Sequence, residues 1–259
     1  MSLIELRNVS KRFGPLVVLD RVSLEVEEGK CLVIIGASGS GKSVMLKHMT
    51  RLLQPDSGEV WFDGRRIDAL AERALVPIRI QFGFLFQMGA LFDSMTVEEN
   101  VGFPLVEHTK KPPAEISRLV DEKLGFVGLP ETRKKMPGQL SGGQRKRVAL
   151  ARAIALGPRV ILYDEPTTGL DPIRSDVINE LILKLQRELR VTSVVVTHDM
   201  HSAFKVADRI VMLKNGKLIF DGTPDEVRGS DNPDIHRFVA GEASEEELAT
   251  LRENDDYSQ

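Results

Sequence analysis

The residues with the clearest chemical purpose lie in a glycine-rich segment, residues 36–43, which reads GASGSGKS and follows the apolar run CLVII. Its glycines allow backbone angles that side chains disfavour, so consecutive N–H groups can turn inward around one anion. Lys42 adds a full positive charge, and the hydroxyl of Ser43, at the start of an expected helix, is suited to Mg²⁺. This spacing predicts a site for the phosphates of a nucleoside triphosphate rather than a structural glycine-rich turn. The residues expected to bind the nucleotide here are Gly36, Ser38, Gly39, Ser40, Gly41, Lys42, Ser43 and Val44.

Two carboxylates and a histidine follow two further apolar runs. Asp164 and Glu165 end the run that starts at Val160, and His198 follows the run at residues 192–197. Continuous apolar runs are typical of central strands in a parallel sheet, whose carboxyl ends face the ligand. Because neighbouring carboxylates repel each other unless they share a cation, this pair indicates a cation at the same edge of the sheet.

The elements that must position these groups alternate along the chain. Residues 3–35 contain three short apolar segments separated by turns, which predicts strands that lead into the glycine-rich segment. A turn at residues 55–58 precedes a predicted hairpin with Asp63-Gly64 at its bend. Residues 97–156 follow a helical pattern interrupted by prolines. Strands and helices in this order predict an α/β fold with a mostly parallel sheet and helices on both faces.

Composition restricts the class of protein. The chain has 259 residues, 42% hydrophobic content and a net charge of −3, so it can bury a large core and has no overall basic field for nucleic acid. Its single cysteine, Cys31, is typical of a reducing compartment. The charged N-terminal residues do not resemble a secretory signal, and the longest uncharged run, residues 80–92, is too short to span a bilayer. We therefore expect a soluble chain that is not exported.

Apolar and basic clusters outside these motifs allow more than one interpretation. Phe82, Phe84 and Phe86 alternate in one expected strand, and we interpret them as core. The loop that follows, residues 88–92, is apolar where loops are usually polar, which indicates a docking surface. The basic run at residues 145–147, RKR, fans around an expected helix. That arrangement favours a solvated face or an anion contact over nucleic-acid binding.

The motifs occur in an order that resembles one protein family. After the glycine-rich segment come Gln87, LSGGQ at residues 140–144, the two carboxylates, GLD at residues 169–171, and His198. This set resembles the nucleotide-binding subunit of ATP-binding cassette (ABC) transporters, for which LSGGQ is the signature. The resemblance implies a P-loop NTPase fold of ABC type, with a RecA-like, mostly parallel core, an N-terminal antiparallel β subdomain and an inserted α-helical subdomain. The implied boundaries are an ABC ATPase domain at 1–240, a helical subdomain at about 90–157 within it, and an acidic C-terminal tail at 241–259.

The resemblance also implies roles for individual residues. Glu165 is expected to polarise the attacking water in ATP hydrolysis, with a second metal ligand as the alternative role. For His198 the alternative is a histidine with purely structural partners, and for Phe13, expected to stack on adenine, it is a core or loop aromatic. The residues expected to be catalytic are Lys42, Gln87, Glu165 and His198, those expected to hold Mg²⁺ are Ser43, Gln87 and Asp164, and those expected to contact ATP outside the glycine-rich segment are Phe13, Ser141, Gly142, Gly143, Gln144 and Asp171.

The signature segment implies a dimer. Ser141 is expected to cap a helix whose first two amides, both from glycines, can bind an anion. In the family the signature of one protomer closes on the ATP held by the other, and Asp171 crosses between them. We therefore expect a homodimer of cassettes. We also expect a separate integral-membrane permease dimer that docks near the segment from Met88 to Phe92.

Two segments resemble one branch of the family more closely, residues 86–105 and residues 160–173. They are similar to the ATPase subunit of the Mla-type phospholipid transporters of Gram-negative envelopes. This similarity implies a phospholipid substrate, a STAS-domain regulator, a lipid-binding MCE-type protein and a peripheral position on the cytoplasmic face of the inner membrane, with the tail ordered only on assembly. The alternatives are an ATPase of another importer or exporter, a soluble ABC protein acting on ribosomes or DNA, and a nucleotide-dependent scaffold.

Overall fold

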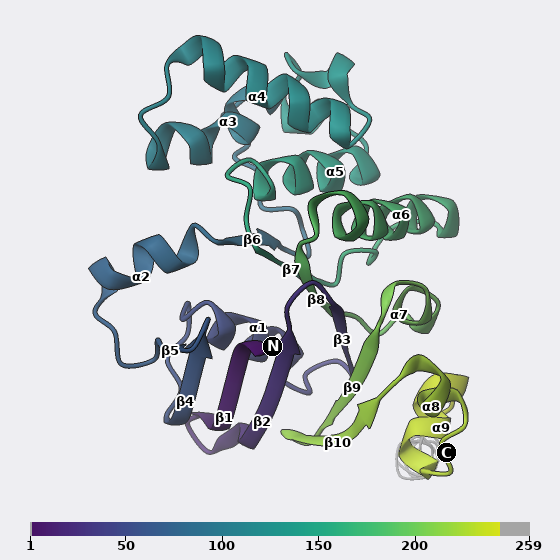
Figure 1. Ribbon diagram of the computed structural model, residues 1–259. Coiled ribbons are helices and arrows are strands. Elements are labelled where there is room, and N and C mark those ends of the chain that lie inside the picture. The colour runs from purple at the N-terminus through teal and green to yellow at the C-terminus, as the bar shows by residue number, and fades with distance from the viewer. Residues whose placement is uncertain (1, 244–259) are drawn as a thin grey trace, which may run out of the picture.

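The computed structural model describes residues 2–243, so the acidic tail predicted at 241–259 lies almost entirely outside the described residues. Two sheets and a group of helices make up the described chain (Figure 1). No helix in this part of the chain combines the length and the apolarity that a bilayer crossing requires.

The larger sheet has six strands in the order β10-β9-β3-β8-β7-β6. Every neighbouring pair from β9 to β6 is parallel, and only β10 runs antiparallel to β9. The mostly parallel sheet predicted from the apolar runs is therefore confirmed. The bounds of its strands are β3 Cys31–Ile35, β6 Phe82–Leu85, β7 Val160–Asp164, β8 Thr192–Val196, β9 Arg209–Lys214 and β10 Lys217–Gly222.

The smaller sheet has four antiparallel strands in the order β2-β1-β4-β5. Its predicted hairpin is confirmed, because Asp63 and Gly64 connect β4 to β5 with φ of 51° and 71°. Two consecutive residues with positive φ match the right-handed twist of the flanking strands. The bounds are β1 Ser2–Phe13, β2 Leu16–Glu27, β4 Ser57–Phe62 and β5 Arg65–Arg66.

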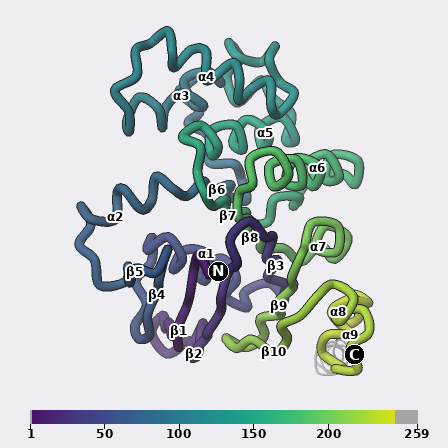
Figure 2. Tube along the Cα trace, viewed as in Figure 1, coloured from purple at the N-terminus to yellow at the C-terminus, as the bar shows by residue number. Residues whose placement is uncertain are grey.

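Three of the helices form a separate group. Figure 1 shows α3, α4 and α5 gathered at one end of the molecule, away from the smaller sheet, and Figure 2 shows the chain leaving β6, passing through them and returning to β7. The bounds are α1 Lys42–Met49, α2 Glu72–Arg79, α3 Val97–His108, α4 Pro113–Phe126, α5 Gly142–Ala153, α6 Pro172–Leu189, α7 Met200–Val206, α8 Pro224–Arg228 and α9 Pro233–Ala240, with 3₁₀ turns at η1 Pro130–Thr132 and η2 Pro137–Gln139.

Strand β3 shows why its sequence is apolar throughout. Cys31, Val33 and Ile35 belong to one hydrophobic cluster, whereas Leu32 and Ile34 belong to another. The first cluster includes residues of α5, α6 and α7, and the second includes residues of α1 and the smaller sheet. A strand covered on both faces has no solvated side, so alternation disappears from its sequence. Cys31 is fully buried in this strand, and this burial raises the pKa of its thiol.

The three phenylalanines interpreted as core occupy different positions. Phe82 and Phe84 are half-buried and pack against the second cluster from β6, at the edge of the sheet. Phe86 lies beyond the end of β6, and its ring stacks on that of Phe84 with the centroids 4.1 Å apart. The interpretation of Phe86 as a strand residue in the core is wrong, because β6 ends before it and the ring lines an open groove.

Candidate nucleotide-binding and catalytic site

The glycine-rich segment, here called the phosphate loop (residues 36–43), connects β3 to α1 and includes the first two residues of that helix. Gly36 has φ of 150°, and a Cβ there would lie 2.3 Å from the carbonyl oxygen of Leu213. Gly41 has φ of 104°, and a Cβ there would lie 2.8 Å from the carbonyl oxygen of Val18. Only glycine fits both places. Helix α1 starts without a side-chain cap and without an acidic residue in its first turn, so its first N–H groups are left for an anion.

Lys42 points back over this loop. Its ammonium donates to the carbonyl oxygens of Gly36 at 2.7 Å and Ala37 at 3.0 Å, and lies 3.9 Å from Glu165 Oε1. The side chain is buried, and this burial lowers the pKa of Lys42, while Glu165 and Asp164 act in the opposite direction. A cation is thus fixed where the phosphates of a nucleotide would bind.

Ser43 and Asp164 meet at the same place although 121 residues separate them in the chain. The Ser43 hydroxyl donates to Asp164 Oδ1 at 2.7 Å. Two oxygen ligands of this kind fit Mg²⁺, which proteins usually bind through one or two carboxylates together with phosphates and water. The hydroxyl of Ser40 in the phosphate loop is buried and has no hydrogen-bond partner among the described residues. An unpartnered buried hydroxyl in this loop is suited to a ligand oxygen.

Glu165 follows the last residue of β7 in a strained conformation. Its φ is 51°, in the left-handed region that side chains other than those of Asn and Asp rarely adopt. Its backbone N–H donates to the carbonyl oxygen of Val196 in β8 at 2.9 Å. Its carboxylate Oε2 lies 2.8 Å from His198 Nδ1 and accepts a hydrogen bond from Thr168 Oγ1 at 3.2 Å. The Glu165 side chain is 11% exposed, so its carboxylate is held by several partners in a site that is not fully closed to solvent.

The remaining predicted residues differ in how exposed they are. Phe13, at the end of β1, has an exposed ring, which makes it accessible for stacking. The Lys11 ammonium lies 5.5 Å from the centroid of this ring. Gln87 is exposed two residues after β6, and its predicted contact with a metal stays a prediction. Val44 is half-buried in α1.

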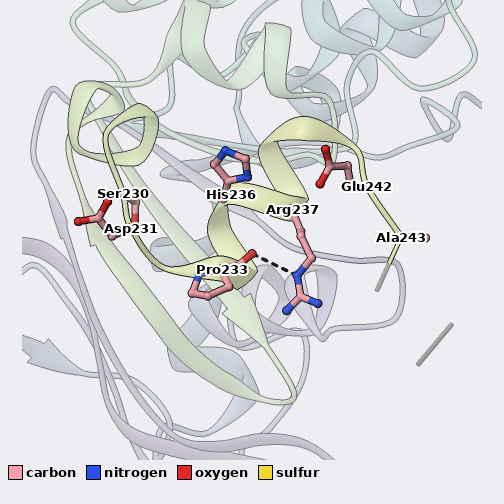
Figure 3. Close-up of a pocket in the computed structure, with 7 residues that line it drawn as sticks. All are labelled: Ser230, Asp231, Pro233, His236, Arg237, Glu242 and Ala243. Carbon is pink, nitrogen blue, oxygen red and sulfur yellow. Dashed lines mark hydrogen bonds between the residues drawn. The ribbon is translucent and has the colours of Figure 1, made fainter. Parts of the chain in front are cut away.

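A cavity of about 860 Å³ opens beside the phosphate loop. It is lined by residues 16–18 of the small sheet, residues 37–40 of the loop, residues 212–216 and side chains of α9. A neighbouring cavity of about 630 Å³ lies beside α9 (Figure 3), where Arg237 Nε donates to the carbonyl oxygen of Pro233 at 3.2 Å. Arg237 and Glu242 line both cavities, so α9 forms one wall of the space next to the phosphate loop.

The signature turn (residues 140–144) starts α5, far from α1 in Figure 1. Ser141 is the N-cap, as predicted, and forms a capping box in which its hydroxyl accepts from Gln144 N at 3.3 Å and Gln144 Oε1 accepts from Ser141 N at 2.9 Å. The first two N–H groups of α5, from Gly142 and Gly143, are not used by this capping box. Asp171 likewise caps α6, with its carboxylate accepting from Arg174 N at 3.0 Å.

The basic run at residues 145–147 was expected to be solvated or to contact an anion, and for Lys146 this prediction is wrong. Lys146 is buried, and its ammonium donates to the carbonyl oxygens of the turn that follows Glu165. Burial lowers the pKa of Lys146 to about 8. No local pattern marks this burial. In the structure Lys146 lies on the buried face of α5, three residues after Gly143 and three before Ala149, which are both buried. Thr168 also contacts Glu165 directly, and none of the sequence motifs predicted a role for it.

Comparison with known proteins decides the family. A family model described as ABC transporter matches residues 19–168, which is more than half of the chain. The chain belongs to the ABC transporter family. This ABC ATPase has the α/β fold that the motifs predicted, and its class of activity is ATP hydrolysis.

Several relatives of this ABC ATPase are named as transport proteins. A "Probable ribonucleotide transport ATP-binding protein mkl" of Mycobacterium leprae is 42% identical over 238 residues, which are 92% of this chain and 69% of the relative. The "Intermembrane phospholipid transport system ATP-binding protein MlaF" of Haemophilus influenzae is 42% identical over 242 residues, which are 93% of this chain and 92% of the relative. A solved dimeric ATP-binding cassette in a post-hydrolysis state, with ADP and Pi bound, has a TM-score of 0.80 and 37% identity, covering 86% of this chain and 99% of that chain.

Proposed function

We propose that this ABC ATPase powers phospholipid transport between envelope membranes through a separate permease dimer. The observation that carries the proposal is the near full-length match to the phospholipid-transport relative, which covers 93% of this chain and 92% of that protein. The proposal treats residues 1–240 as the ATPase domain, with the helical subdomain at about 90–157. It also includes a STAS-domain regulator, an MCE-type lipid-binding protein and a position on the cytoplasmic face of the inner membrane.

Ribonucleotide transport is a second candidate. The mycobacterial relatives named for ribonucleotide transport are also 42% identical to this chain, although the match covers only 69% or 66% of their length. The two candidates share the ATPase cycle and differ in the cargo of the permease.

In the proposed ATPase cycle the phosphate loop and Lys42 bind the phosphates, and Phe13 stacks on the base. Bound Mg²⁺, held by Ser43 and Asp164 with Gln87 nearby, would neutralise charge on the phosphates. Glu165 accepts a proton from the attacking water, because its Oε1 lies 3.9 Å from the Lys42 ammonium and is therefore close to the place where the phosphates bind.

The contact between His198 and Glu165 determines which ring nitrogen of His198 faces a nucleotide. Its Nδ1 lies 2.8 Å from the Glu165 carboxylate, so Nδ1–H is the donor in that pair. A neutral imidazole then has only a lone pair at Nε2, and it donates to a phosphate oxygen there only as imidazolium. The side chain is 53% exposed, so Nε2 is accessible to a ligand.

The proposed dimer places the signature turn of one protomer on the nucleotide of its partner. This arrangement is supported by the dimeric cassette to which the chain is similar. It is also supported by the first two amides of α5, from Gly142 and Gly143, which the capping box leaves unused. Helix α5 lies with α3 and α4, in a different part of the molecule from α1 (Figure 1). Asp171 lies at the start of α6 beside these two glycines.

The proposed permease contact is an apolar groove of about 630 Å³, here called the aromatic groove. Met88 lies in the adjoining loop with 85% of its surface exposed, and the Phe92 ring packs on Phe103 with centroids 5.0 Å apart. A short helix with apolar side chains from a membrane partner would fit this groove. The lining residues are Val76, Arg79, Ile80, Phe82, Gly83, Phe84, Phe86, Ala90, Phe92, Phe103, Pro104, His108, Arg152, Ala153 and Leu156.

The test of the function is the cargo of the purified complex. The chain is co-expressed with the permease from the same organism, and mass spectrometry identifies the molecules retained after purification in detergent. Enriched phospholipid relative to a complex with an unrelated ABC permease supports the proposal. Retained ribonucleotide other than ATP and ADP supports the second candidate, and co-sedimentation of the chain with ribosomes would overturn both.

The docking surface is tested by membrane recovery. Met88→Glu places a charge on an exposed residue of the loop, so we expect it to lose recovery with permease-containing membranes while keeping ATPase activity. Leu52→Glu is the matched control, because Leu52 is also exposed but lies neither in the aromatic groove nor in the loop that adjoins it. Equal recovery of the two variants would contradict this docking surface.

A further inference from the structure

Lys146 connects the signature helix to the turn that carries the catalytic carboxylate. It lies on α5, five residues after Ser141, and is 6% exposed. Its ammonium donates to the carbonyl oxygens of Glu165 at 3.3 Å, Pro166 at 2.8 Å and Thr168 at 2.7 Å. An ammonium group has three N–H donors, so this set of acceptors satisfies it completely.

The turn held by Lys146 needs support. Glu165 has φ of 51°, and strain of this kind persists only where surrounding contacts determine it. Thr168 closes the turn, because its N–H donates to the Glu165 carbonyl oxygen at 3.3 Å and its hydroxyl donates to Glu165 Oε2 at 3.2 Å. The Lys146 ammonium is therefore linked to the carboxylate through the backbone and side chain of Thr168.

The position of Lys146 along α5 couples the signature turn to the turn at residues 165–168. The N-terminal end of α5 carries the signature turn, and the lysine lies little more than one helical turn further on. A helix moves as a rigid body over such a distance, so displacement of the signature turn displaces the ammonium. The carbonyl oxygens of the turn at residues 165–168 follow because they are its acceptors.

We propose that Lys146 is a positioning residue for Glu165, which makes the geometry of the carboxylate depend on the docking of α5. This proposal rests on the role of Glu165 given under the proposed function. Within one protomer, Lys146 joins the signature turn, which serves the nucleotide of the partner, to the carboxylate that serves the protomer's own nucleotide. Each site of the dimer thereby senses closure of the other.

The experiment compares Lys146→Met, which keeps the length of the side chain without its donors, with Lys146→Gln, which keeps an amide donor. ATP hydrolysis is measured as kcat and KM, and ATP affinity is measured separately by equilibrium binding. We expect kcat of Lys146→Met to fall by about tenfold to a hundredfold with ATP affinity changed less than about threefold. Lys146→Gln should recover part of that loss.

The control is Arg147→Met. Arg147 is the next residue on α5 and also donates to backbone carbonyl oxygens, but to those of Val127 and Gly128, outside the site. We expect it to keep kcat within about twofold. A loss of kcat in Lys146→Met that is matched by Arg147→Met would overturn the proposal, since it would report general weakening of α5.

The double variant Lys146→Met with Glu165→Gln separates this proposal from the assumption beneath it. If Lys146 acts through Glu165, single-turnover cleavage in the double variant is no slower than in Glu165→Gln alone. A further loss of the same size as in the wild-type background would overturn the positioning role. Full turnover of Glu165→Gln would instead overturn the proposed role of Glu165 itself.

Discussion

Glu165 combines backbone strain with several fixed contacts. A left-handed conformation at a residue of this kind costs of order 1–3 kcal/mol and is typical of functional sites. The cost is offset by the hydrogen bond of its N–H to Val196 and by the partners of its carboxylate, His198 and Thr168. The arrangement presents one carboxylate beside the ammonium of Lys42.

Replacing this carboxylate by an amide gives the first prediction. Glu165→Gln keeps the volume and removes the proton acceptor, so we expect turnover to fall by about a hundredfold or more with ATP affinity nearly unchanged. A steady-state ATPase assay and a nucleotide-binding titration measure the two quantities. Loss of ATP binding would instead assign Glu165 the role of a metal ligand.

His48 in α1 shows the opposite case, a buried titratable group without a catalytic neighbour. Its Nδ1–H donates to the carbonyl oxygen of Leu53 at 2.9 Å, and its Nε2 is buried without a hydrogen-bond partner among the described residues. Burial lowers the pKa of His48 to about 4. The folded chain therefore excludes a proton that the unfolded chain binds below its ordinary pKa of about 6.5.

This difference predicts how stability depends on pH. Between about pH 6.5 and 4 the unfolded state binds the extra proton, so stability falls as the pH falls, by as much as about 3 kcal/mol in total. His48→Asn keeps a donor near Nδ1 and does not titrate, so its urea-unfolding free energy should fall less over that interval. Equal pH slopes for the two proteins would contradict the prediction.

The loop between β6 and α3 is held by one side chain of the helix that follows it. Asn100 in α3 is fully buried; its carbonyl oxygen accepts from the Phe92 N–H, and its amide donates to the carbonyl oxygens of Phe92, Met95 and Thr96. The helix begins with a capping box at Thr96. Together these contacts fix the loop that borders the aromatic groove.

Removing the amide should loosen this element. Asn100→Ala leaves buried backbone groups of the loop without partners, so we expect a loss of about 2–3 kcal/mol in the free energy of unfolding. Urea denaturation measures it, with Glu107→Ala as control, because Glu107 is exposed on the same helix. A loss of less than about 0.5 kcal/mol would mean that the loop does not depend on Asn100.

The molecule as a whole separates two anion-binding helix starts. Helix α1 begins at the phosphate loop, and α5 begins at the signature turn in the group of helices at the other end of the molecule (Figure 1). Both starts have N–H groups available for a ligand, but one chain does not bring them together. A second copy is the simplest way to complete a site that uses both.

Dimer formation tests this arrangement. In the Glu165→Gln background, which retains ATP, we expect saturating ATP to convert the chain to a dimer in multi-angle light scattering. Ser141→Arg in that background should remain monomeric, because the larger side chain blocks the signature turn, whereas Arg147→Met should still dimerise. Equal dimerisation of the Ser141→Arg variant would contradict a nucleotide held between two copies.

Features that depend on local backbone chemistry could be predicted from the residues alone. Gly36 and Gly41 adopt conformations that only glycine tolerates, Ser141 caps the helix it precedes, and uninterrupted apolar runs become the buried strands. In each case the residue and its near neighbours carry the cause, so the pattern was sufficient.

The folded chain was needed to show which distant groups meet and which charged groups are buried. Ser43 and Asp164 lie 121 residues apart yet share a hydrogen bond, and Lys146, which reads as a surface lysine, is buried against the turn after Glu165. Phe86 lies outside the core because β6 ends at Leu85, whereas the alternating phenylalanines predicted a strand that includes Phe86. Burial and pairing depend on what packs from elsewhere in the chain, and that information is absent from any local pattern.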